Sequence, residues 1–122
     1  SSQLSGDTIL LSTEKQKPKL LSVINHAMLI NQTKEGLFNQ LSGYTLLAFF
    51  LNGLLDHAQT NGMPAQSIFY PQDDKENYMG MSSNYGNTIE AFFVNKVIHT
   101  IKYTQQVNGT LFPMLSIMDH CN

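Results

Sequence analysis

Few residues of this chain have the types and spacing that catalysis or metal binding requires. The histidines show none of the HxH, HxxxH or CxxC spacings of metal sites, and they are His26, His57, His99 and His120. Asp119-His120-Cys121 contains the residue types of a cysteine nucleophile with its base and orienting acid. Adjacent residues point in different directions, however, and cannot contact one another in that order. We therefore predict no metal, no cofactor and no catalytic residue, and expect a protein that is not an enzyme.

Two loops share only their composition with known ligand loops. Asp73, Asp74, Glu76 and Asn77 lack the alternating acidic pattern of a calcium loop and its distal glutamate. The stretch GMSSNYGN offers hydroxyl and backbone N–H groups before an expected helix, but it lacks the lysine and spacing of a phosphate-binding loop. Both patterns favour ordinary solvated loops.

The composition excludes several classes of partner. Charged residues make up only 13% of the 122 residues, the formal net charge is −2, and every basic residue is a lysine. Nucleic-acid binding needs clustered basic side chains, so we predict no nucleic-acid partner. The longest apolar run, 46–51, is far shorter than the roughly 20 residues of a membrane-spanning helix. The single cysteine, Cys121, cannot form an internal disulfide, which indicates a cytoplasmic protein.

The hydrophobic pattern predicts a single α+β domain with three to four helices packed on a small antiparallel sheet. Residues 1–17 are expected to form an N-terminal strand at 8–11 and a lysine-rich linker, and residues 18–122 the domain itself. The predicted helices cover 18–30, a short piece at 37–41, 43–59 and 88–105. A hairpin is expected from strands at 67–70 and 77–81, which a charged loop joins.

The stretch LAFFLNGLLDHA, residues 47–58, fits two different structures. Asn52-Gly53 between apolar flanks is a common hairpin turn. The same stretch also continues an apolar stripe with helical spacing, formed by Tyr44, Leu47, Ala48, Leu51, Leu54, Leu55 and Ala58. Because a hairpin does not account for this stripe, we predict a helix that contains the glycine at a cost of about 1 kcal/mol.

Two groups of residues lie off the predicted core faces and are candidates for a protein interface. Leu46, Phe49 and Phe50 would cover a second side of the central helix, with Gly53 as a point of close approach. In the last helix, a mixed aromatic and polar stripe would comprise Phe92, Lys96, His99 and Tyr103. Closure of Phe92 and Tyr103 over the domain's own core is an equally good interpretation.

The main functional hypothesis is a non-enzymatic protein–protein interaction module, an adaptor or chaperone-like subunit of a larger assembly, which binds a protein partner or a second copy. Small acidic adaptors of bacterial secretion systems are similar in size and charge balance, an analogy of class only. A small-ligand-binding or enzymatic domain is the first alternative. It would bring together at least two of Asp56, His57, Tyr78, Tyr85 and His99 in one cleft. A structural subunit of a viral or pilus-like assembly is the second alternative.

Overall fold

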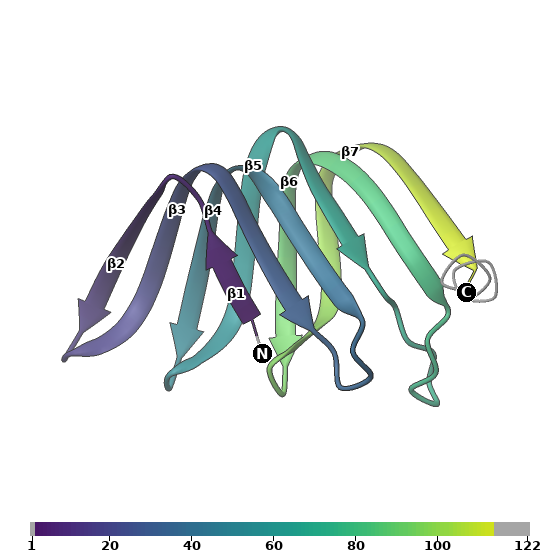
Figure 1. Ribbon diagram of the computed structural model, residues 1–122, viewed down its shortest axis with the longest axis horizontal. Helices are drawn as coiled ribbons and strands as arrows, with labels where there is room; N and C mark the ends of the chain where they lie inside the picture. The colour runs from purple at the N-terminus through teal and green to yellow at the C-terminus, as the bar shows by residue number, and fades with distance from the viewer. Residues whose placement is uncertain (1, 114–122) are drawn as a thin grey trace.

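The protein is built from one strongly bent antiparallel sheet. The structure, a computed structural model, describes residues 2–113, and these form seven strands in the sheet order β1-β3-β4-β5-β6-β7, with β2 also paired to β3 (Figure 1). The strands are β1 (Ser2–Ser5), β2 (Thr8–Glu14), β3 (Lys17–Gln32), β4 (Phe38–Leu51), β5 (Leu54–Phe69), β6 (Gly80–Val94) and β7 (Val97–Pro113). The predicted α+β fold is therefore wrong, and the described part of the chain contains no helix that could cross a membrane.

Each long strand bends near its middle, and the bends lie side by side along the top of the molecule (Figure 1). The pairing register shifts at these bends, at 24–27 in β3, 42–45 in β4, 61–65 in β5 and 85–86 in β6. We call one side of the bent sheet the first arm (β2 with 17–24, 45–51, 54–61, 88–94 and 97–104). The other side is the second arm (β1 with 27–32, 38–42, 65–69, 80–86 and 109–113). Such bulges let a continuous strand turn a corner and remain in the sheet.

Backbone-to-backbone packing at the bends explains two of the glycines. A Cβ atom added to Gly43 would lie 2.4 Å from Thr60 Oγ1 and 2.7 Å from the backbone oxygen of Asn61. A Cβ atom added to Gly62 would lie 2.8 Å from the backbone nitrogen of Tyr44. Neighbouring strands at the bend of β4 and β5 thus approach too closely for any side chain.

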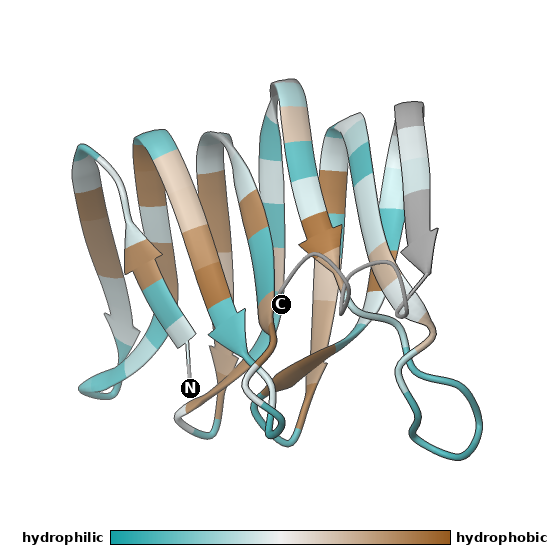
Figure 2. Cartoon of the chain, turned by 45° about the vertical axis from the view of Figure 1, so that its right-hand side comes forward, coloured by the Kyte–Doolittle hydropathy of each residue, from teal (hydrophilic) through white to brown (hydrophobic). Residues whose placement is uncertain are grey.

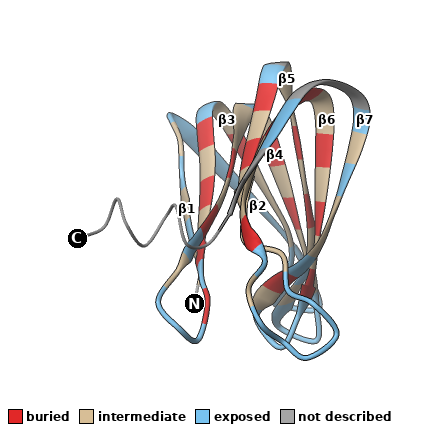
Figure 3. Cartoon of the chain, turned by 90° about the vertical axis from the view of Figure 1, so that its right-hand side faces the viewer, coloured by how far each residue is buried: buried red, intermediate tan, exposed pale blue. Residues whose placement is uncertain are grey.

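The core lies between the two arms. Val23, Leu46 and Ile89 from the first arm and Leu29 and Leu41 from the second are fully buried. Figure 3 shows buried and partly buried positions alternating along the strands, as expected when every second side chain points inward. Across the core, Ser67 Oγ of the second arm lies 2.7 Å from the Tyr103 hydroxyl oxygen of the first.

A buried asparagine also links the two arms. Asn31, with 0% exposure, accepts a hydrogen bond at 2.9 Å from the backbone N–H of Ile98 and donates one at 2.9 Å to the backbone oxygen of Lys96. Its amide nitrogen also donates to Ser2 Oγ at 2.7 Å, and Asn39 donates to its side-chain oxygen at 3.4 Å. Because buried polar groups need partners, this network fixes how the β6–β7 turn sits on β3.

The stretch at residues 47–58 is a hairpin, so the predicted central helix at 43–59 is wrong. Asn52 and Gly53 have φ angles of 52° and 80°, the left-handed pair that a type I′ turn requires. Leu51 and Leu54 pair directly beside the turn, and Ala48 pairs with Ala58 further along. Alternation places Leu46 and Ala48 inside, and Leu47 between them points to the other face, where it is partly buried.

The other predicted helices are also wrong. Residues 18–30 belong to β3 and residues 38–41 to β4. Residues 88–105 contain parts of β6 and β7, which the turn at Asn95-Lys96 joins. In β3 the inward residues Leu21, Val23, Ala27 and Leu29 keep a period of two across the bulge. Leu20, Ile24 and Met28 add apolar residues on the other face, and the two faces together imitate helical spacing. The strand expected at 8–11 lies within β2. The segments at 67–70 and 77–81 do flank the charged loop between the paired strands β5 and β6.

Candidate functional site

The structure separates the eight predicted interface residues into three environments. Leu46 is buried, and Phe50 and Tyr103 pack partly buried against the core. Gly53 and Lys96 lie in two different hairpin turns. Phe49, Phe92 and His99 lie outside the core, with Phe49 and Phe92 half-buried and His99 exposed. The predicted helical stripe from Phe92 to Tyr103 does not exist, because the chain reverses direction between them.

Phe49 and Phe92 do come together, on the outer surface of the first arm, through a residue between them. The His57 ring stacks on Phe49 with centroids 4.3 Å apart and an interplanar angle of 11°, and it lies 6.0 Å from the Phe92 centroid. Lys102 Nζ lies 5.1 Å from the Phe92 centroid, and His57 Nδ1 lies 2.8 Å from Asp56 Oδ2. These side chains contact one another across neighbouring strands, so the row stabilises the sheet surface.

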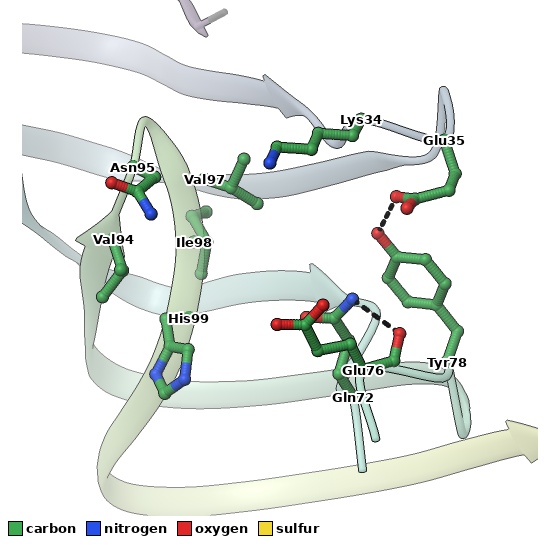
Figure 4. Close-up of a pocket in the computed structure, with 10 residues that line it drawn as sticks. All are labelled: Lys34, Glu35, Gln72, Glu76, Tyr78, Val94, Asn95, Val97, Ile98 and His99. Carbon is green, nitrogen blue, oxygen red and sulfur yellow. Dashed lines mark hydrogen bonds between the residues drawn. The ribbon is translucent and has the colours of Figure 1, made fainter. Parts of the chain in front are cut away.

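A small cleft lies at the base of the molecule, between the loops of the second arm and the β6–β7 turn (Figure 4). Its volume is about 170 Å³, and Tyr78 and His99 both line it. The Tyr78 hydroxyl donates to Glu35 Oε2 at 2.5 Å, and burial together with this bond raises the Tyr78 pKa above its ordinary value. Asp56 and His57 lie elsewhere, on the outer surface of the first arm. Residues 2–113 also offer no group of three histidine, cysteine, aspartate or glutamate side chains that could hold a metal ion.

The size of this cleft argues against a ligand site. Tyr78 and His99 meet the geometric condition set for the small-ligand alternative, since both line the same cleft. Binding pockets for small molecules and cofactors usually enclose about 300–1,000 Å³, however, whereas the volume of this cleft is about 170 Å³.

Strand β2 is the most unusual surface of the described chain. All seven of its residues are exposed, and its three successive large apolar side chains, Ile9, Leu10 and Leu11, are 47%, 55% and 55% exposed. Figure 2 shows this hydrophobic band on the outermost strand at the far left. Residues 8–13 carry no charge, proline or glycine. Edge strands are normally protected by such residues or by a bulge of their own, so β2 has the properties of a strand that another strand covers.

A groove with both apolar and charged lining residues adjoins this edge on the first arm. It lies between the β2–β3 and β4–β5 turns, has a volume of about 350 Å³, and is lined in part by Phe50 and Leu51. Leu51 and Leu54 are 61% and 51% exposed. The groove also carries three lysines and one glutamate, so its local charge is positive, and the glutamate, Glu14, contacts Lys19 Nζ at 2.8 Å. The hydrogen bond and the positive charge of Lys19 lower the pKa of the Glu14 carboxyl group.

Fold and surface together define residues 2–113 as an all-antiparallel β domain, folded over on itself, with an exposed apolar strand at one sheet edge. No family model, no curated protein and no solved structure matches the chain. The apolar run at 8–11 was the sequence signal for this edge. It predicted a strand, but its position at the sheet edge depends on pairing between distant segments.

Proposed function

We propose that the protein is a non-enzymatic interaction module that binds a protein partner through β2. The observation that carries the proposal is the complete exposure of β2, with three adjacent apolar side chains about half exposed or more. An extended strand of a partner can pair with such an edge, since backbone hydrogen bonds supply affinity and alternate side chains supply specificity. The groove beside Phe50 and Leu51 would accept apolar side chains of the partner.

Two residues of the predicted interface, Leu46 and Tyr103, take no part in this proposal, because their side chains pack in or against the core. The small-ligand alternative is less well supported, since the basal cleft is small. Edge pairing is equally compatible with a structural subunit of a larger assembly, which differs in being an obligate oligomer. The cytoplasm remains our proposed compartment, from the single cysteine of the chain.

The test compares partner capture by the wild-type protein and two variants. Leu11→Lys places a charge on the exposed edge, and Val94→Lys makes the same kind of change at an interior strand, where Val94 is 53% exposed and lines the basal cleft. Both variants should remain folded, because each side chain is already in water. We expect wild type and Val94→Lys to recover the same protein from the source lysate, and Leu11→Lys to lose it. If only Val94→Lys fails to recover the protein, the proposal is refuted and the partner binds at the basal cleft instead.

A further inference from the structure

The hairpin geometry shows which backbone groups of β2 are free. Lys15 and Gln16 have φ angles of 52° and 65°, so Glu14 and Lys17 close a two-residue turn as a hydrogen-bonded pair. In an antiparallel ladder every second residue directs both its N–H and its C=O to the same neighbour. The pairing register shifts between Ser12 and Thr13, but the extra residue, Lys19, belongs to β3, so β2 itself stays regular. From Glu14 backwards, alternate residues of β2 therefore bond to β3. Ile9, Leu11 and Thr13 direct their N–H and C=O groups to the open edge.

We propose that the partner of β2 is a second copy of this chain, in an antiparallel β2–β2 pair with a two-fold axis at Leu11. This inference rests on the proposed function of the edge. In this register Leu11 faces Leu11 of the second copy and Ile9 faces Thr13, so all the free backbone groups pair with one another, in about six hydrogen bonds. Thr8 faces Glu14, so the whole of β2 pairs with itself.

The side chains of β2 fit this symmetric arrangement. On the inner face of the sheet, Leu11 would pack against Leu11 of the second copy. This contact extends the apolar row that Leu11, Leu21 and Ala48 form across β2, β3 and β4. On the outer side, Leu10 of one copy meets Ser12 of the other. No like charges oppose each other, and at either end Asp7 of one copy comes opposite Lys15 of the other. A self-complementary patch of this kind is what a closed two-fold dimer requires.

Other registers fit less well. Moving the axis to Ser12 would place Leu10 opposite Glu14, so an apolar side chain would face a carboxylate. Moving it to Leu10 would leave Glu14 opposite Gly6, outside the strand, and would separate Asp7 from Lys15. The axis at Leu11 is thus the register in which strand length, free backbone groups and charge agree.

The test combines molecular mass with a register-specific disulfide. Sedimentation of the full chain over a range of concentrations should show the wild type reaching twice its monomer mass, and Leu11→Lys remaining at the monomer mass. For the register, all variants carry Cys121→Ser, and Leu10→Cys and Ser12→Cys are prepared separately. Each single variant places its thiols diagonally, about 7–8 Å apart, which is too far for an unstrained disulfide. A mixture of the two places them directly opposite each other.

We expect a mild oxidant to give a covalent dimer several-fold faster in the mixture than in either variant alone. Equal rates in all three samples would overturn the register and with it the proposed dimer. A wild type that stays monomeric at every concentration would also overturn the second copy as partner. If that monomer still captures a protein that Leu11→Lys loses, the interaction function stands. If it captures nothing, both proposals fail.

Discussion

Replacing Asn31 by alanine should destabilise the protein strongly, because Asn31 supplies hydrogen bonds that the backbone of the opposite arm cannot obtain elsewhere. Its side-chain oxygen accepts from the N–H of Ile98, which is only 4% exposed, and its amide donates to the backbone oxygen of Lys96. A buried donor left without a partner costs about 1–3 kcal/mol. Since Lys96 is exposed, water can replace the second bond, and its loss adds only about 1 kcal/mol.

The free energy of unfolding of Asn31→Ala should therefore be lower by about 2–4 kcal/mol, a large part of the 5–15 kcal/mol typical of a domain. Urea unfolding followed by circular dichroism measures this difference, with an unchanged slope against denaturant if the folded state stays compact. Gln32→Ala is the matched control, because Gln32 is the exposed next residue of β3 and its loss should cost less than about 0.5 kcal/mol. Equal losses for the two variants would refute the role assigned to Asn31.

Three further changes test the fold. Gly43→Ala should cost more than about 2 kcal/mol in urea unfolding, because its Cβ would lie 2.4 Å from Thr60 Oγ1; full stability would show that the bend is not closely packed. Phe49→Asp should leave a cooperatively folded protein, whereas Leu46→Asp should abolish folding, because Phe49 lies outside the core and Leu46 is buried. Near-ultraviolet circular dichroism distinguishes the folded from the unfolded variant. Similar spectra for the two variants would contradict the alternation in β4. Tyr103→Phe should cost about 1–3 kcal/mol, because Ser67 loses a buried partner. Burial raises the Tyr103 pKa, so this residue favours the folded state below pH 10 and ceases to do so as the pH rises through its folded value; the variant should lose less stability there than wild type.

The sequence contained the local signals for strands, but their interpretation depended on the bends. Alternation holds within each half-strand, as in Leu46 and Ala48, yet in β4 and β5 the irregularity at the bend changes whether odd-numbered or even-numbered residues face inward. Over about 15 residues, the spacing of the apolar positions then resembles the helical period of three to four residues. The glycines at the bends would have signalled bulges, but the close approach that requires them involves strands distant in sequence.

The Asn52-Gly53 turn shows how the competing signals could have been separated. In a helix, the apolar residues need not lie at equal sequence distances on the two sides of Asn52-Gly53. In a hairpin, residues at equal distances from the turn pair with each other. Leu51 with Leu54 and Phe50 with Leu55 are such pairs, and both are apolar. This symmetry supported the hairpin as well as the stripe supported a helix. The left-handed preference of Asn-Gly then favours the hairpin.

Phe49 and Phe92, two aromatic residues predicted from the sequence to lie in an interface, are not the strongest candidate binding surface of the protein. Phe49 and Phe92 have found partners within the sheet, one on each side of His57, and a new ligand would have to compete with those contacts. Along β2 the backbone groups of Ile9, Leu11 and Thr13 face no other strand within residues 2–113, and the side chains of Ile9, Leu10 and Leu11 are apolar and exposed. Covering this edge forms hydrogen bonds and removes apolar surface from water at the same time. Association should therefore depend on β2, and the aromatic row should affect it only through the stability of the fold.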